Sequence, residues 1–280
     1  MEAVQAHEAV FQHSPSGRAL FYRLWQSEKP KGLVVIVHGF GEHGGRYEPL
    51  AHALAEAGLT VACPDLWGHG RTAGRRGDID RFDRYLDDLE ILTSQVFIAQ
   101  TGQPRFGVFG HSFGGLVAIH WALRQPSSLR CLILQSPLLG VGFPLPQWKE
   151  RLAGALRRVW PRLSLPIGLD PAWLSHDPAI AQRYQQDPLV HNRISLRCYQ
   201  TLQVMMPQAL ERARGIITPT LVLYGSDDRV VSVKACQECF EKLACEKRLV
   251  GFPGCYHELH HESVMPSVVE EVLQWVQAHA

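Results

Sequence analysis

Three short motifs in this chain carry residue types that catalytic or cofactor sites use, and each implies a different chemistry. Residues 110–114 spell GHSFG, a GxSxG pattern typical of a nucleophilic serine. Residues 39–44 spell GFGEHG, the GxGxxG pattern of loops that cradle a dinucleotide pyrophosphate. Residues 257–261 spell HELHH, the HExxH pattern that places two zinc ligands one helical turn apart. The strands and helices predicted around each motif distinguish these three interpretations.

The serine motif lies where a short apolar stretch meets a helical pattern. Residues 106–109 predict a strand and residues 113–124 predict a helix, so Ser112 falls on the turn between them. In such a nucleophile elbow the glycines permit a tight, strained turn, and the serine hydroxyl is exposed at its tip. This context makes GxSxG the strongest of the three signals.

A serine nucleophile of this kind needs an acid and then a histidine further along the chain. The predicted strand 221–224 is followed by the sequence GSDD, so Asp227 and Asp228 both lie just past a strand end. The predicted strand 247–250 is followed by a loop that carries His257. Ser112, one of the two aspartates and His257 thus follow separate strand ends in the order that a catalytic triad requires. Spacing alone does not choose between the aspartates.

The competing motifs fit their surroundings less well. Asp65 ends the next strand, where a ribose-binding acid belongs, but a dinucleotide loop here would put the Glu42 carboxylate beside a pyrophosphate. Phe-Pro-Gly at 252–254 lies just before the HExxH motif and predicts a loop rather than a helix, and no third zinc ligand is evident. Cys236 and Cys239 form a lone CxxC inside a helical pattern, which favours buried small side chains over zinc. We therefore expect no cofactor and no metal.

Strand and helix patterns alternate along most of the chain. Residues 9–25 predict a hairpin; further strands are expected at 33–37, 59–63, 106–109, 131–134, 221–224 and 247–250, and helices at 47–57, 83–100, 113–124, 232–244 and 263–279. This alternation predicts an α/β fold around a mostly parallel sheet. The chain is then a single domain, 1–280, with a core formed by 1–136 and 216–280.

The alternation is interrupted at 137–215, which holds prolines and helical pieces but no convincing buried strand. Apolar residues recur at helical spacing from Trp148 to Val159. Five cations against Glu150 give the stretch 145–165 a charge of +4. We interpret 137–215 as a helical cap over the carboxyl ends of the strands, where open α/β sheets bind ligands. The basic helix either makes a transient contact with an anionic membrane surface or has an ordinary solvated face.

Composition narrows the class of protein further. Hydrophobic residues make up 46% of the 280 residues and charged residues 20%, which supports a substantial core. Lys and Arg number 28 against 27 Asp and Glu, so no global basic field favours nucleic-acid binding. The first five residues lack the features of a secretory signal, and the seven cysteines follow no disulfide framework. We therefore expect a cytoplasmic protein, peripheral at membranes if the cap docks there.

Together these motifs resemble the monoacylglycerol lipase and lysophospholipase group of the α/β-hydrolase superfamily. Residues 38–47 (HGFGEHGGRY) look like its HGxGEHxxRY block, and residues 65–72 (DLWGHGRT) look like DxxGHGxS with Thr72 in place of serine. GHSFGG at 110–115, GSDD at 225–228 and the loop of His257 are similar to its GHSxGG, GSxD and histidine loop. The similarity spans about residues 33–262 and implies an α/β-hydrolase fold of about eight strands.

The resemblance also implies a mechanism. The GSxD pattern selects Asp228 over Asp227, so the implied triad is Ser112, Asp228 and His257. The backbone amides of Phe40 and Phe113 would form the oxyanion hole, which replaces the dinucleotide interpretation of the glycine-rich loop. The implied activity is ester hydrolysis through an acyl-enzyme.

The implied substrate is a monoacyl lipid, with monoacylglycerol first and lysophospholipid second. Glu42, Arg46 and His260 resemble residues that meet a glycerol-type head group in this family, or they form a structural ion pair and a solvated histidine. A general carboxylesterase stays open, as does a non-catalytic homologue that only binds lipid. The sequence leaves the oligomeric state and the acyl-chain preference undetermined.

Overall fold

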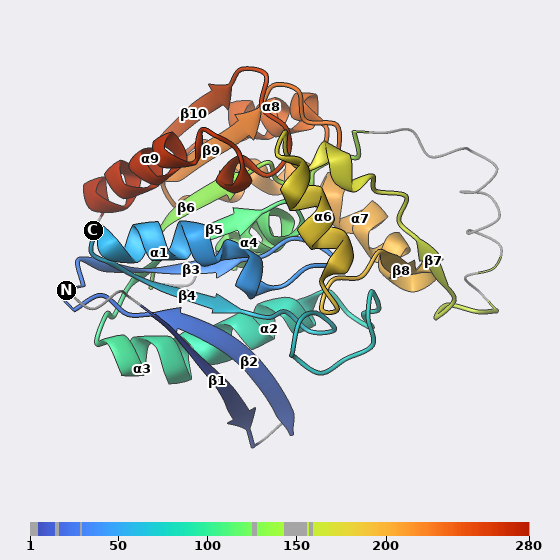
Figure 1. The fold of residues 1–280 in the computed structure, drawn as a ribbon, viewed down its shortest axis with the longest axis horizontal. Helices are drawn as coiled ribbons and strands as arrows, with labels where there is room; N and C mark the ends of the chain where they lie inside the picture. Colours follow the sequence, from blue (N-terminus) through green and yellow to red (C-terminus); the bar gives the residue numbers. More distant parts are fainter. Residues whose placement is uncertain are drawn as a thin grey trace.

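An eight-stranded sheet forms the centre of the molecule (Figure 1). The structure is a computed structural model that describes residues 5–14, 17–28, 30–124, 128–142, 156 and 159–279. The strands are Ala6–His13 (β1), Arg18–Trp25 (β2), Gly32–Val37 (β3), Leu59–Pro64 (β4), Phe106–His111 (β5), Leu129–Gln135 (β6), Thr220–Gly225 (β9) and Lys247–Phe252 (β10). Their order in the sheet is β1-β2-β4-β3-β5-β6-β9-β10. Within this described sheet β1–β2 and β2–β4 pair antiparallel and the other pairs are parallel, which confirms both the predicted hairpin and the mostly parallel sheet.

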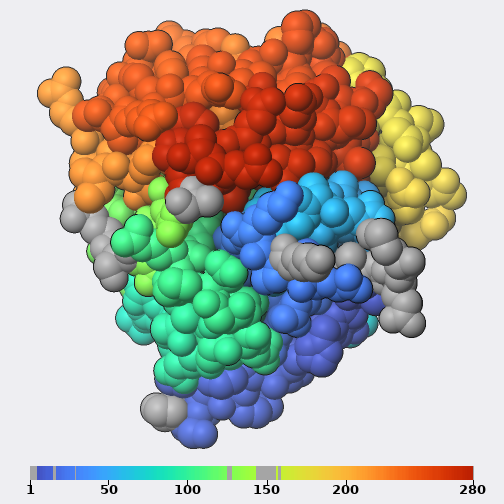
Figure 2. All heavy atoms as spheres, turned by 90° about the vertical axis from the view of Figure 1, so that its left-hand side faces the viewer, coloured from blue at the N-terminus to red at the C-terminus, as the bar shows by residue number. Residues whose placement is uncertain are grey.

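Helices cover both faces of this sheet, as the alternating pattern predicted. One face carries η1 (Gly44–Tyr47), α1 (Glu48–Glu56) and α9 (Met265–Ala278). The other carries α2 (Asp83–Leu92), α4 (Phe113–Leu123) and α8 (Val233–Lys242). Strand β3 shows why both faces are apolar, because Val34 and Ile36 join the α1 and α9 core whereas Val35 and Val37 join the core on the opposite side. Figure 2 shows α9 lying directly over α1 at the end of the molecule away from α6.

The helix predicted at 83–100 contains an irregular turn. It consists of α2, a π-helical turn at Thr93–Phe97 (η2) and α3 (Ile98–Thr101). It ends at Gly102, whose φ of 65° closes the last turn in the left-handed conformation that glycine adopts readily. The remaining predicted core elements lie within a few residues of their expected bounds.

The segment between β6 and β9 gathers at one end of the sheet (Figure 1). Its described elements are β7 (Ser164–Pro166), η3 (Pro171–Trp173), α6 (Pro178–Gln186), β8 (Arg193–Ser195), α7 (Leu196–Arg212) and η4 (Ala213–Gly215). β7 and β8 pair with each other in a separate two-stranded sheet that the sequence pattern did not indicate. Most of the predicted basic helix, including Lys149, Arg151, Arg157 and Arg158, lies outside the described residues.

Parallel strands bring the loops that carry the motifs to a single edge. The chain leaves β3, β5, β9 and β10 in the same direction, so the loops that follow these strands meet at their carboxyl ends. Among the described helices, none combines the length and apolar character that crossing a bilayer requires.

Candidate active site

Ser112 occupies a strained turn between β5 and α4. Its φ of 53° and ψ of −118° are unusual for a residue with a side chain, and the chain enters α4 at the next residue. A Cβ on Gly114 would lie 2.0 Å from the carbonyl oxygen of Val37, so the first turn of α4 packs directly on the end of β3. This strand, turn and helix are those that the GxSxG motif predicted.

Asp228 and His257 are joined by a buried hydrogen bond. The Nδ1 of His257 lies 2.8 Å from Oδ2 of Asp228. The other carboxylate oxygen, Oδ1, accepts from the backbone amides of Val230 at 2.8 Å and Val231 at 3.0 Å. Asp227 is exposed and accepts from its neighbour, Ser226. The aspartate that faces the histidine is therefore Asp228, a distinction that sequence spacing left open.

The electrostatics of this pair suit a general base held by a carboxylate. Burial lowers the pKa of His257, but the Asp228 charge and hydrogen bond more than offset it, so the pKa lies above its usual range. Burial raises the pKa of Asp228, whereas His257 and the two backbone amides lower it below its usual range. Burial, reinforced by the nearby His257, lowers the pKa of His111 to about 4, so this second imidazole is neutral.

A cavity of about 380 Å³ connects Ser112 and His257. Its volume lies in the range of small-molecule sites, and most of its wall is apolar. The apolar part includes Leu138, Val141, Leu165, Ile167, Leu174, Ile194, Leu202 and Met206, all of which come from the segment between β6 and β9. Glu42 and Glu258 supply carboxylates to the same wall. The arrangement can hold an apolar chain against a nucleophile beside a small polar region.

The two amides expected in the oxyanion hole come from different elements beside the cavity. Phe40 lies in the loop after β3, and Phe113 is the first residue of α4, whose amide has no acceptor within the helix. Their rings meet edge to face with centroids 5.4 Å apart, and Phe40 lines the cavity. The loop and the helix start are therefore packed together next to Ser112.

A buried ion network lies beneath the polar part of the cavity wall. Arg46 Nε donates to Glu42 Oε2 at 2.8 Å, and Arg46 Nη2 donates to both Glu258 oxygens at 2.8 and 2.7 Å. Glu42 Oε1 also accepts from Tyr47 Oη and from the backbone amide of Gly39, each at 2.6 Å. Burial raises the pKa of both glutamates, but the attraction of Arg46 outweighs it and holds each pKa below its usual range.

Of the three residues expected at the head group, only Glu42 lines the cavity. Arg46 lies behind it in the ion network, and His260 stacks on Tyr47 with ring centroids 4.6 Å apart. Glu258 lines the cavity but was not predicted as a site residue, because its partner Arg46 is 212 positions away in the chain. The one feature of the sequence that could have indicated Glu258 as a site residue is its position directly after His257 in the HExxH motif.

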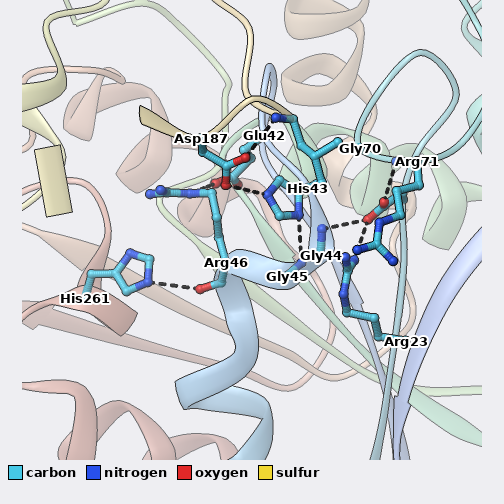
Figure 3. Close-up of polar contacts among 12 residues, drawn as sticks. Arg23, Glu42, His43, Gly44, Gly45, Arg46, Gly70, Arg71, Asp187 and His261 are labelled. Atoms are coloured by element: carbon cyan, nitrogen blue, oxygen red, sulfur yellow. Dashed lines mark hydrogen bonds and ion pairs between the residues drawn. The ribbon is translucent and has the colours of Figure 1, made fainter. Parts of the chain in front are cut away.

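Figure 3 shows further polar contacts of the same loop. The His43 ring accepts from the Gly45 amide at Nδ1, so its Nε2 donates to Asp187 at 2.8 Å. His261 approaches the backbone of Arg46, with Nε2 3.0 Å from the Arg46 carbonyl oxygen. The loop after β3 is thus attached both to the segment between β6 and β9 and to the loop after β10.

The residues present fit the alternative chemistries poorly. The Gly39 amide, which a pyrophosphate would need, donates to Glu42 instead. The HExxH residues share no helix, because η5 covers only Leu259–His261 and His257 binds Asp228. Ligand atoms of Glu258, His260 and His261 lie within 4.8 Å of one another, but Arg46 occupies the Glu258 carboxylate. Cys236 and Cys239 are buried in α8, and burial raises the pKa of both thiols.

This strand order, with a serine on a strained turn after β5 and a linked Asp–His pair after β9 and β10, defines an α/β-hydrolase. Residues 28–264 match the family described as serine aminopeptidase, S33. Monoglyceride lipase of Homo sapiens is 35% identical over 93% of this chain and 87% of its own length. A crystal structure of Paleococcus ferrophilus monoacylglycerol lipase is 33% identical, with a TM-score of 0.83 over 93% of this chain and 99% of that one. An uncharacterized abhydrolase domain-containing protein of Dictyostelium discoideum is 32% identical over 92% of this chain, which spans 28% of that longer protein. The chain belongs to the monoacylglycerol lipase and lysophospholipase family of the α/β-hydrolase superfamily.

Proposed function

We propose that this protein hydrolyses the ester bond of monoacylglycerols to fatty acid and glycerol. The observation that carries the proposal is a buried Asp228–His257 hydrogen bond at the wall of an apolar cavity that Ser112 also lines. Membership of the family and the similarity to the monoglyceride lipase of Homo sapiens and the monoacylglycerol lipase of Paleococcus ferrophilus support the same substrate class.

In the proposed mechanism Ser112 is the nucleophile and His257 the general base. His257 takes the hydroxyl proton while Asp228 fixes the imidazole with Nδ1 protonated and stabilises the imidazolium that forms. The Phe40 and Phe113 amides stabilise the tetrahedral oxyanion, a contribution of about 2.7–4 kcal/mol for each donor. His257 then protonates the glycerol leaving group and activates the water that hydrolyses the acyl-enzyme.

We propose that the two ends of the substrate lie against different walls of the cavity. The acyl chain lies along the apolar residues of the segment 137–215, which we propose acts as the cap on a core formed by 1–136 and 216–280. Glu42 contacts the head group, because it alone of the three expected residues reaches the cavity. Arg46 and His260 hold Glu42 and Tyr47 in place from behind.

We propose that the cavity opens along a rim of the segment 137–215 that exposes apolar side chains. Leu165 lines the cavity and is 42% exposed, and Trp160 nearby in the sequence is 60% exposed. We propose that this rim rests transiently on a lipid surface, from which the substrate enters. The protein would then be cytoplasmic and peripheral at membranes, with a lipid ester as its substrate partner.

The test is hydrolysis of a monoacylglycerol series from short to long acyl chains, with wild type beside Ser112→Ala. We expect fatty-acid release with a maximum at medium or long chains and background activity in the variant. A short-chain maximum would indicate a general carboxylesterase, and faster cleavage of lysophosphatidylcholine would indicate a lysophospholipase. Full activity of Ser112→Ala would overturn the mechanism, and inactivity of both proteins with tight lipid binding would indicate a non-catalytic homologue.

A further inference from the structure

Glu262 links the histidine loop, residues 253–264, to the cap segment. Its buried Oε1 accepts from the Tyr256 amide at 3.1 Å, from the His176 amide at 3.3 Å and from His176 Nδ1 at 2.9 Å. The His176 ring also stacks on Tyr256, with centroids 3.7 Å apart and planes inclined by 24°. The residue directly before His257 is therefore held from the cap through both its backbone and its ring.

The residue directly after His257 is held from the same place. The Glu258 amide donates to the Leu174 carbonyl oxygen at 2.8 Å, and Ser175 Oγ donates to the His261 carbonyl oxygen at 2.8 Å. Leu174 also lines the cavity. Both sequence neighbours of His257 thus depend on residues 174–176.

The other end of this part of the cap grips the loop after β3. Asp187 accepts from His43 Nε2 at 2.8 Å, and the His191 amide donates to the Gly41 carbonyl oxygen at 2.7 Å (Figure 3 shows the first contact). The Arg46 guanidinium lies over the Tyr184 ring, 4.9 Å from its centroid. Residues 174–191, here called the α6 arm, therefore connect the loop that carries Phe40 with the loop that carries His257.

We propose that the α6 arm positions these two loops relative to each other, with His176 and Asp187 as its positioning residues. The loops follow β3 and β10, which β5, β6 and β9 separate in the sheet, so these two strands do not pair with each other directly. The Arg46–Glu258 ion pair joins them from below, and the α6 arm joins them from the cap side. A displacement of about 1 Å at a reacting group lowers the rate by up to about 100-fold, so such a brace affects turnover.

The position of His176 separates this role from a simple structural one. Its side chain is 54% exposed, so truncation creates no core cavity, and a half-exposed contact contributes little to global stability. A structural contact would change the melting temperature or nothing at all, whereas a positioning contact lowers kcat with KM unchanged. This inference rests on the proposed function, because it assigns His257 and Phe40 their roles in the reaction.

The experiment compares His176→Ala, His176→Asn and His176→Phe on one monoacylglycerol, with kcat, KM and melting temperature measured for each. Asparagine keeps a donor near the position of Nδ1, whereas phenylalanine keeps only the ring that stacks on Tyr256. We expect His176→Ala to lower kcat about 10-fold with KM within about twofold, and His176→Asn to recover most of the loss. Gln182→Ala, an exposed change on α6 between the two contacts, is the control and keeps wild-type kinetics.

Asp187→Ala and the double variant with His176→Ala test whether the arm acts as one brace. If the two contacts were independent supports, their effects on kcat would multiply to a loss of about 100-fold in the double variant. If they belong to one brace, detaching either end already removes most of its effect. We therefore expect the kcat of the double variant to stay near that of the worse single variant. The inference would be overturned if kcat were unchanged in both single variants, or if only KM or the melting temperature changed. In that case an inactive Ser112→Ala variant would still leave the proposed function intact. Full activity of Ser112→Ala would overturn the function, and the inference with it.

Discussion

Replacing Asp228 by asparagine tests the central contact of the site. Because Oδ1 accepts from two backbone amides, an asparagine at this position must keep its oxygen there and turn its NH₂ toward His257. That NH₂ donates to Nδ1, so the imidazole proton moves to Nε2. A histidine in this tautomer cannot accept the Ser112 proton.

The size of the effect follows from the geometry. With Nδ1 and Oδ2 2.8 Å apart, the charge centres lie about 4 Å from each other, and at an effective dielectric constant of about 20 their attraction is about 4 kcal/mol. This corresponds to about 3 pKa units of His257 and about 10³ in rate. The wrong tautomer adds to this loss, and the same exchange in a Ser-His-Asp triad lowers kcat by about 10⁴.

The assay is the pH dependence of kcat/KM on a monoacylglycerol, with Asp227→Asn as the matched control. Activity requires neutral His257, so the wild-type rate falls as pH drops through the raised pKa of this group. Without the Asp228 charge, only the weaker attraction of Glu258 and Glu42 opposes the effect of burial on the pKa of His257, so the acidic limb of the residual rate moves to lower pH. A folded Asp228→Asn protein with more than about a tenth of wild-type kcat/KM would refute this reasoning, as would an equal loss in Asp227→Asn.

Three further changes have expected outcomes. Gly41→Ala should lower kcat and melting temperature more than Gly102→Ala. Both glycines have positive φ, but only at Gly41 would a Cβ meet a carbonyl oxygen, because that of His191 would lie 2.3 Å away. Arg46→Met should lower the free energy of unfolding by about 3–5 kcal/mol, since it removes the cation that two buried carboxylates share, and chemical denaturation at neutral pH measures it. Burial raises the pKa of Asp88 from 3.8 to about 6, so the folded state loses stability as pH rises between these values. Asp88→Asn should therefore raise the free energy of unfolding above pH 6 by up to about 3 kcal/mol and leave it unchanged near pH 3, and an unchanged difference across pH would contradict the assignment.

The parts of the site that could be predicted are those encoded by short stretches. Ser112, Asp228 and His257 each follow a strand, so the strand pattern and the loop composition locate them without knowledge of tertiary contacts. The choice of Asp228 required the family pattern or the structure. Its turn makes two backbone amides converge on Oδ1, and spacing does not encode that convergence.

The contacts that could not be predicted join residues far apart in the chain. His43 and Asp187 are 144 positions apart, and His176 and Glu262 are 86 apart. No periodic sequence pattern indicates either pair, because each hydrogen bond joins two loops. The paths of these loops depend on how the segment between β6 and β9 packs. The strands β7 and β8 are three residues each, too short for a period-two pattern to distinguish them from loop.

The glycine-rich loop shows how a correct pattern can predict the wrong ligand. In a dinucleotide site the glycines leave room for a pyrophosphate. Here each of the three has a neighbour from the protein itself: a Cβ on Gly39 would lie 2.7 Å from Glu42 Oε1, one on Gly41 2.3 Å from the carbonyl oxygen of His191, and one on Gly44 2.7 Å from Cys63 Sγ. The glycines are therefore needed because the backbone of this loop packs closely against the Glu42 carboxylate and against the backbone of His191. Glu42, which argued against a phosphate in the sequence, is the residue around which this loop is built.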